Sequence, residues 1–141
     1  MGIFNKKQKA VKIQTLAELE PMIETGKPIL IDFFQIGCAP CQVMDGIMNE
    51  LAREYGESAH VVKVDVAKVA GAAQTFQVRS TPTFVLLSKV EKKVSKKARQ
   101  RGNGDKPNAG KMSARWRSSG LVKKDQLQRL LESNGAERAT A

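Results

Sequence analysis

The chain has 141 residues, 41% of them hydrophobic, and a formal net charge of +10 at pH 7. These values fit one globular domain over residues 1–141 and exclude a fully disordered chain, collagen, a coiled coil and a disulfide-dense secreted scaffold. No apolar run in the sequence approaches the roughly 18 residues of a membrane-spanning helix. The first residues contain no apolar stretch of the kind found in signal peptides, so we expect a cytoplasmic protein that does not bind membranes.

The positive charge is concentrated in two segments. Residues 1–12 carry four lysines and no acid, and residues 89–111 carry nine Lys or Arg residues against two acids. The rest of the chain is close to neutral. We therefore expect a basic N-terminal segment over residues 1–10, a basic flexible insertion over residues 89–111 and a C-terminal tail over residues 133–141.

The first half of the chain predicts two helices around one buried strand. A short amphipathic helix is expected after Thr15. The apolar run Ile29–Phe34 has strand length and no alternation, which is typical of a strand covered on both faces. Apolar residues then recur at helical spacing from Val43 to Tyr55, which predicts a second helix.

The second half continues the alternation. In chain order we expect a strand over Val61–Val66, a weak helix over Ala67–Phe76, a strand over Thr83–Leu87, a short edge strand over Ala114–Ser118 and a closing helix over Leu121–Leu131. Strands that alternate with helices predict an α/β sheet with helices on both faces.

The two cysteines of the chain stand between the first long strand and the second helix. They are Cys38 and Cys41, separated by Ala39 and Pro40. Cys38 is expected at a helix N-terminus, where free N–H groups and the helix dipole stabilise a thiolate. Cys41 follows one turn later, and Pro40 suits the first turn because its missing N–H has no partner there.

Three other interpretations compete with a redox-active dithiol. A structural zinc site needs four ligands, whereas the cysteines and the lone His60 supply three, so we predict no metal. Two inert buried cysteines would not require this spacing, and an intermolecular disulfide is unusual in the cytoplasm. A redox-active pair is the favoured interpretation.

The residues around this pair resemble the thioredoxin family. Asp32 stands six residues before Cys38, and Thr81, Pro82 and Thr83 resemble the cis-proline loop of that family. The resemblance covers roughly residues 11–88 and 114–132. It implies a thioredoxin fold, with a central mixed β-sheet flanked by helices on both faces and the basic insertion in the hairpin after the cis-proline strand.

The resemblance also implies an activity. The protein is expected to be a thiol–disulfide oxidoreductase that reduces protein disulfides, takes part in electron transport and cell redox homeostasis, and works as a monomer without a bound cofactor. Its expected partners are protein disulfide substrates and a thioredoxin reductase or another dithiol donor. Cys38 would attack the substrate disulfide and Cys41 would resolve the mixed disulfide.

Two charged residues also fall at family positions. Asp32 lies in an apolar strand, so its pKa is expected to be raised, which suits a proton acceptor for Cys41. The alternative is a pleat-exposed aspartate at a strand end. Lys63 is expected either to partner Asp32 across adjacent strands or to face the solvent.

The remaining family positions surround the cysteines. If the bond before Pro82 is cis, the backbone of Thr81 is free to pair with an extended substrate segment, whereas a trans proline at a strand edge is the alternative. The expected substrate-binding positions are Gly37, Ala39, Pro40, Thr81, Pro82 and Gly120.

Several positions depart from the family pattern. Gly37 replaces the usual tryptophan before the first cysteine, which removes a flat apolar contact and loosens the loop. Phe34 replaces a second tryptophan. Ala39 replaces a glycine, and the Ala-Pro pair stays close to the reducing Gly-Pro type, so a reductant is expected.

The insertion at residues 89–111 is the largest departure. It is either a solvated hairpin loop kept soluble by its charge or an arm that docks on an anionic partner. The segment has no aromatic residue to stack on bases, so non-specific, salt-sensitive binding is the form that docking would take. An alternative function follows, in which the protein is a redox-regulated or redox-inert binding module.

Overall fold

The computed structural model describes residues 8–89 and 112–139. Most of the predicted basic N-terminal segment, nearly all of the predicted insertion and the end of the C-terminal tail lie outside these residues. Within the described part of the chain, no helix has the length and apolar character needed to cross a membrane.

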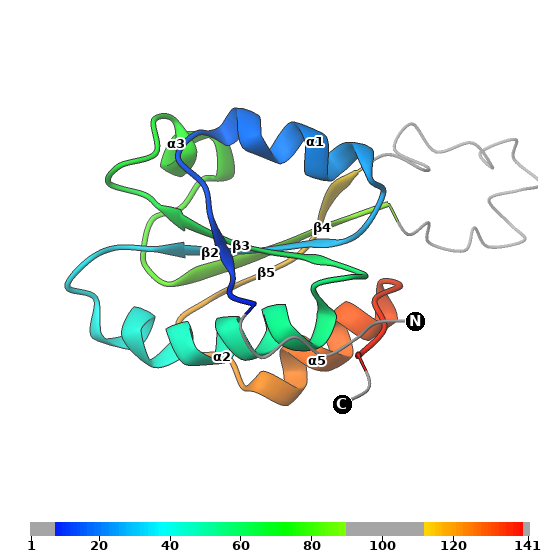
Figure 1. The fold of residues 1–141 in the computed structure, drawn as a ribbon. Helices are drawn as coiled ribbons and strands as arrows, with labels where there is room; N and C mark the ends of the chain where they lie inside the picture. The colour runs from blue at the N-terminus through cyan, green and yellow to red at the C-terminus, as the bar shows by residue number, and fades with distance from the viewer. Residues whose placement is uncertain (1–7, 90–111, 140–141) are drawn as a thin grey trace, which may run out of the picture.

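Strands and helices alternate along the described chain. In order they are β1 (Val11–Lys12), the 3-10 turn η1 (Leu16–Glu18), α1 (Leu19–Glu24), β2 (Ile29–Phe34), α2 (Ala39–Tyr55), β3 (His60–Asp65), α3 (Ala72–Phe76), β4 (Thr83–Ser88), β5 (Ser113–Ser119) and α5 (Lys124–Ser133). Figure 1 shows these elements as a sheet between two layers of helices.

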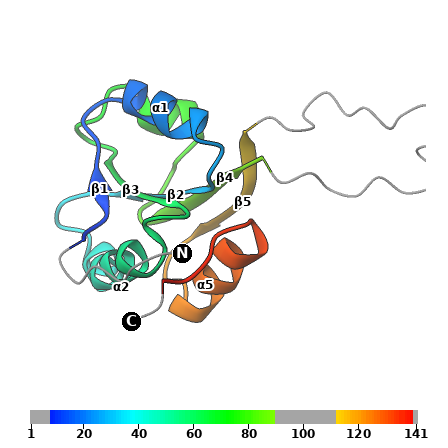
Figure 2. The same cartoon turned by 45° about the vertical axis from the view of Figure 1, so that its right-hand side comes forward.

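The described strands form one mixed sheet in the order β1-β3-β2-β4-β5. β3 runs parallel to β1 and to β2, whereas β4 is antiparallel to both β2 and β5. β5 and β1 are the two edges, and Figure 2 shows β5 on the side of α5. The central position of β2 explains its continuous apolar run, because both of its edges and both of its faces are covered.

Helices cover both faces of the sheet. α1 and α3 lie on one face, and α2 and α5 lie on the other (Figure 1). Each face has its own buried apolar cluster: one packs beneath α2 and α5 and includes Leu30 and Phe84, and the other packs beneath α1 and α3 and includes Ile31 and Val85. Successive residues of each strand therefore enter opposite clusters, as the pleat requires.

The expected α/β architecture is present, with differences at the ends of elements. β2 has the predicted bounds, and α2, β4 and β5 lie where strand and helix were expected. The prediction of a helix from residue 67 is wrong, because α3 begins only at Ala72 after Gly71, whose φ of 77° is left-handed. α5 begins at Lys124 rather than at residue 121.

The sequence interpretation did not include β1. It is two residues long and both of them are exposed, so it carries no hydrophobic pattern. β1 nevertheless sets one edge of the site, since Lys12 is the register partner of Lys63 on β3.

The pleat of β2 determines which side chains face α2. Leu30 belongs to the cluster beneath α2, so Asp32, two residues along the strand, faces the same helix. Phe33 belongs to the opposite cluster. A carboxyl group is therefore built into the interface between the sheet and α2.

Candidate active site at the start of α2

The two cysteines form a disulfide at the N-terminus of α2. Cys38 is the N-cap residue, Pro40 lies in the first turn, and the Cα atoms of Cys38 and Cys41 are 5.2 Å apart. The backbone N–H of Cys41 donates to Cys38 Sγ over 3.2 Å. A helix N-terminus thus places a donor and the positive end of its dipole at the first sulfur, an environment that stabilises a thiolate.

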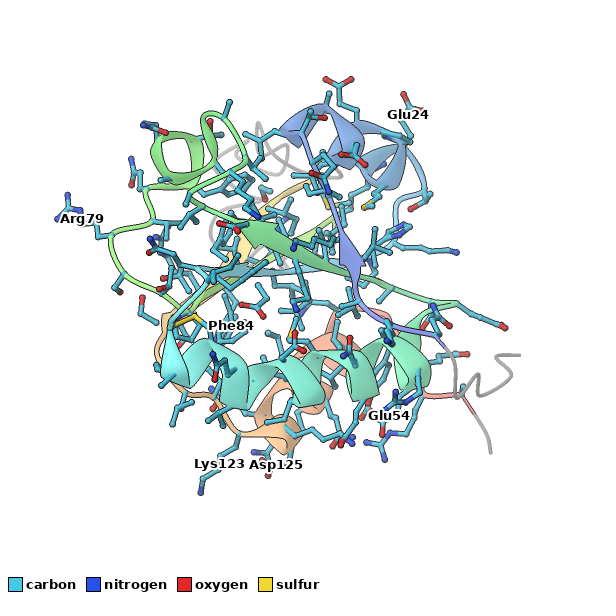
Figure 3. All side chains as sticks on the ribbon, turned by 60° about the vertical axis from the view of Figure 1, so that its left-hand side comes forward. Glu24, Glu54, Arg79, Phe84, Lys123 and Asp125 are labelled. Carbon is cyan, nitrogen blue, oxygen red and sulfur yellow. A yellow bond between two sulfur atoms is a disulfide. The ribbon has the colours of Figure 1, made fainter. Side chains whose placement is uncertain are left out.

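The two sulfurs differ in exposure. Cys38 is half-buried, whereas Cys41 is 5% exposed and belongs to the core side of α2. The disulfide is visible in Figure 3 at the start of α2, the end of the helix farther from Glu54. An incoming sulfur can therefore reach Cys38 more readily than Cys41.

A second loop meets the disulfide from the sheet. The Thr81–Pro82 peptide bond before β4 is cis. Cys38 Sγ lies 3.5 Å from the carbonyl oxygen of Thr81, and Pro82 is buried beside it in the chain. The N–H of Gly120 donates to the carbonyl oxygen of Pro82 over 2.8 Å, so Gly120 holds the same loop from the end of β5.

Asp32 is the buried acid behind the disulfide. Its side chain has no exposed surface, and neither carboxyl oxygen has a hydrogen-bond partner among the described residues. Burial raises the pKa of Asp32 to about 7, and the charge of Lys63 opposes this shift. The expectation of a raised pKa from an acid in an apolar strand agrees with this environment.

Lys63 lies beside Asp32 across the adjacent strands, as one of the two predictions had it, but it forms its ion pair with another acid. It is the register partner of Asp32 on the adjacent strand, but its Nζ forms an ion pair with Asp45 on α2. The Lys63 side chain is 18% exposed, which is between a buried and a fully solvent-facing lysine. Burial lowers the pKa of Lys63, while attraction to Asp32 works in the opposite direction.

An open pocket of about 260 Å³ adjoins the disulfide. Its walls come from β2, the following loop, α2 and β3, and its lining residues are Phe34, Gln35, Ile36, Gly37, Cys41, Gln42, Asp45 and Lys63. The pocket thus combines an apolar wall with the Asp45–Lys63 ion pair. Gly37 contributes no side chain, and Ile36 is 69% exposed.

Three comparisons place this geometry among known proteins. A sequence model of the family described as Thioredoxin matches residues 10–106. The chain is 38% identical over 77 residues to Thioredoxin-1 of Drosophila melanogaster, a match that covers 53% of this chain and 72% of the fly protein. It is 36% identical over 77 residues to the chloroplastic Thioredoxin Y of Oryza sativa subsp. japonica, which covers 54% of this chain and 46% of the rice protein.

The three-dimensional comparison agrees. A thioredoxin variant from Halobacterium salinarum NRC-1 superposes with a TM-score of 0.67 and 25% identity, over 89% of this chain and 90% of the other. The chain belongs to the thioredoxin family. Its α/β architecture with a mixed sheet is the thioredoxin fold. The chain spans about half the length of the chloroplast relatives that it matches.

Two features of this thioredoxin-family site were not predicted from the sequence. Asp45 had not been considered as the partner of Lys63, although it stands one helical turn after Cys41 and so shares the side of α2 near the disulfide. Gly37 has a φ of 86°, a left-handed conformation that side chains adopt only at a cost. The position therefore disfavours the tryptophan that the family usually carries there.

His60 lies outside the site, and the described residues offer no metal site. His60 is half-buried at the start of β3, and its Nε2 lies 2.9 Å from the hydroxyl of Thr25, away from the disulfide in sequence and in contacts. Among residues 8–89 and 112–139, no group of three or more His, Cys, Asp or Glu side chains is arranged to hold a metal ion.

Proposed function

We propose that this protein reduces protein disulfides by cycling between a Cys38/Cys41 dithiol and the Cys38–Cys41 disulfide. The observation that carries the proposal is the pair itself: a half-buried sulfur at the N-cap of α2 and a buried sulfur one turn later, joined in a disulfide. Membership of the thioredoxin family supports thiol–disulfide chemistry in general. The choice of protein disulfides as substrates is our inference.

The first chemical step belongs to Cys38. Its thiolate attacks one sulfur of the substrate disulfide, the substrate S–S bond breaks, and the other substrate sulfur leaves as a thiolate that takes a proton from water. A mixed disulfide between Cys38 and the substrate remains. The N–H of Cys41 and the N-terminal end of α2 favour the charged form of Cys38 that this attack requires.

The second step belongs to Cys41. Its thiol loses a proton and the resulting thiolate attacks Cys38 Sγ, which forms the Cys38–Cys41 disulfide and releases the second substrate thiolate. Two electrons have then moved from the protein to the substrate. Asp32 is our proposed acceptor of the Cys41 proton, because both groups lie between the sheet and α2 and a pKa near 7 suits proton transfer at neutral pH.

The substrate segment would lie along the loop before β4. The backbone of Thr81 faces Cys38 Sγ, and strand addition there would bring an extended chain past the nucleophile. Ala39 and Pro40 follow Cys38 in the first turn of α2, and Gly37 leaves the adjoining pocket open. Gly120 would act indirectly, through its hydrogen bond to Pro82.

A dithiol donor must return the protein to its reduced form. We propose a thioredoxin reductase or another dithiol donor for this role, no bound cofactor, and a monomer as the working form. The cytoplasm stays our prediction for the compartment, on the basis of the sequence, and the chloroplastic relatives offer the contrasting location to test.

Insulin reduction driven by dithiothreitol tests the proposal. We compare the wild type with Cys38→Ser and Cys41→Ser, and we verify by circular dichroism that each variant is folded. Catalysis by the wild type that both substitutions abolish supports a working dithiol reductase. A folded wild type that forms the Cys38–Cys41 disulfide but does not accelerate insulin reduction contradicts it.

A further inference from the structure

Charged residues form a row across the sheet beneath α2. Lys12 on β1 is in register with Lys63 on β3, and Lys63 is in register with Asp32 on β2. The next position in the row, on β4, is the apolar Phe84. Asp32 thus has a cation-bearing neighbour on one side and an aromatic ring on the other.

Two carboxyl groups lie near Lys63, those of Asp32 and Asp45, and Lys63 forms its ion pair with Asp45, the more solvated of the two. Its Nζ contacts Asp45, whose side chain is 44% exposed, and lies 4.9 Å from the centre of the Phe34 ring. Pairing with Asp32 instead would move the ammonium beneath α2, where Asp32 has no exposed surface. Removing an ammonium from water carries a large free-energy cost, which favours the outer partner.

We propose that Asp45 is a positioning residue: by holding the Lys63 ammonium at the pocket, it leaves the Asp32 carboxyl without an ion pair among the described residues and so available to take the Cys41 proton. The inference rests on the proposed dithiol cycle for its chemical meaning. The structural observation behind it is that Lys63 lies between Asp32 and Asp45 and, within the described part of the chain, forms an ion pair only with Asp45.

The surrounding charges fit this arrangement. From β1, Lys12 is in register with Lys63 and lies 5.4 Å from the centre of the Phe34 ring. α2 contributes Asp45 and the buried Cys41, and β4 contributes Phe84, which has no charge. Lys63 is therefore the nearest cation in register with Asp32. Whether its ammonium turns toward Asp32 or toward Asp45 decides how strongly the Asp32 carboxylate is stabilised.

Removal of the Asp45 carboxylate has a definite expected consequence. In Asp45→Asn the Lys63 ammonium loses its ion-pair partner, and Asp32 is the remaining carboxylate whose charge attracts it. A cation that moves to within 4–6 Å of a carboxyl group lowers its pKa by about one to three units. A carboxylate with a lower pKa is a weaker base toward a thiol.

Asp45 has a second way to influence Asp32, which the test must separate. The negative charge of Asp45 itself disfavours ionisation of a nearby carboxyl group, so its removal lowers the pKa of Asp32 even if Lys63 does not move. The two routes differ in one respect. Only the proposed route requires Lys63, so a double-mutant cycle distinguishes them.

The experiment is a titration of the Asp32 side-chain carboxyl carbon by NMR in the reduced, full-length protein. The variants are Asp45→Asn, Lys63→Met and the double variant Asp45→Asn/Lys63→Met. Asp45→Glu keeps a carboxylate at this position, and Asp125→Asn is the matched control, because it removes one acid that pairs with Arg129 on α5. Figure 3 shows Asp125 on α5 below α2.

We expect the pKa of Asp32 to fall by about one unit or more in Asp45→Asn, and by less than about 0.3 units when the same substitution is made in the Lys63→Met background. Asp45→Glu and Asp125→Asn should leave it near the wild-type value. An equal fall in both backgrounds, or no fall in the wild-type background, overturns the proposal.

The titration does not depend on catalysis, so it remains informative if the protein fails to reduce insulin. Amide spectra establish that each variant is folded before its titration is compared. If insulin reduction is observed, its rate supplies a second readout. Asp32 must be ionised to accept a proton, so the acid limb of the pH–rate profile should move to lower pH in Asp45→Asn and stay in place in Asp125→Asn.

Discussion

Both ends of α2 carry ion pairs, but the two ends differ in how many acids the lysine contacts. Toward the C-terminal end, Lys124 of α5 contacts Glu50 at 2.7 Å and Glu54 at 2.9 Å, and Gln128 donates a further hydrogen bond to Glu54. Toward the N-terminal end, Lys63 also stands near two acids but contacts only Asp45. Asp32 stays buried and without a hydrogen-bond partner among the described residues.

This difference assigns a stabilising role to the ion pairs at the C-terminal end of α2 and a role in proton transfer to the acid at the N-terminal end. A cation that contacts both neighbouring acids holds two helices together and, with Gln128, keeps the pKa of Glu54 below its usual value. A cation that contacts one of two acids leaves the other with a raised pKa and a destabilised charge. We therefore expect substitutions of the charged residues near the cysteines to change the pH dependence of the reaction, and substitutions at Lys124 to change the stability of the fold without changing the reaction.

The largest expected effect is on the stability of Asp32→Asn. The pKa of Asp32 has its ordinary value of 3.8 in the unfolded chain and is about 7 in the folded protein. Between these two pH values the folded state binds more protons than the unfolded state, so the stability of the wild type falls as the pH rises. The difference corresponds to about 4 kcal/mol at roughly 1.4 kcal/mol per unit. Asp32→Asn removes this penalty.

Urea denaturation of the oxidised protein at pH 4 and pH 8 measures the free-energy cost of ionising Asp32 in the folded state. The stability of Asp32→Asn relative to the wild type should increase by about 4 kcal/mol between the two pH values. Comparing the two pH values cancels the fixed cost of the buried amide. A pH-independent difference would show that Asp32 ionises normally in the folded protein.

A smaller cost is expected at Gly37. Its φ of 86° is unfavourable for a side chain by about 1–2 kcal/mol, whereas an added Cβ would meet no atom within 4 Å. Gly37→Ala should therefore destabilise the protein by this amount in urea denaturation. An unchanged stability would mean that the loop before Cys38 relaxes to a negative φ.

The Lys124 end of the helix offers the contrasting variant. Burial works to raise the pKa of Glu54, but hydrogen bonds from Lys124 and Gln128 and the Lys124 charge outweigh it, so the pKa lies below its usual value. Lys124→Met should cost about 1 kcal/mol at pH 7. This cost should disappear as the pH falls through the lowered pKa of Glu54, because the carboxylate is then protonated in both states.

Insulin reduction by Lys124→Met provides the functional half of this test. The rate and its pH profile should match those of the wild type, since the ion pair lies away from the disulfide along α2. A shifted pH profile would mean that the two ends of the helix are energetically coupled.

The smallest expected effect lies at Gly46, between the two ends. Gly46 is exposed on α2, and an added Cβ would meet nothing within 4 Å. Alanine favours a helix over glycine by roughly 1 kcal/mol or less, so Gly46→Ala should stabilise the protein by that amount. Thermal denaturation at pH 7 checks the sign, and a lower melting temperature would contradict it.

Much of the fold could be predicted from the sequence because its strongest signals are local. The apolar run of β2 has the bounds expected from its residues, and the helical spacing after Cys41 places Met44 and Met48 in the core, where both are fully buried. β1 could not be predicted in this way. Two exposed residues form a strand there only because β3 offers an unpaired edge.

The site shows the same limit. The spacing of Cys38 and Cys41 and the apolar surroundings of Asp32 are visible in the sequence, since both depend on neighbours along the chain. The partner of Lys63 is not, because it depends on which of two acids from different elements lies nearer to water. The conformation of Gly37 likewise follows from how the loop joins β2 to α2, not from its own residue type.

Trapping of the mixed disulfide tests the central claim most directly. Each single-cysteine variant, Cys41→Ser and Cys38→Ser, is reduced and mixed with insulin, and the covalent adduct is quantified by mass spectrometry. The account predicts a stable adduct at Cys38 in Cys41→Ser and little adduct in Cys38→Ser, because Cys41 is 5% exposed. Equal trapping by both variants, or faster trapping at Cys41, would contradict the assignment of Cys38 as the attacking thiolate.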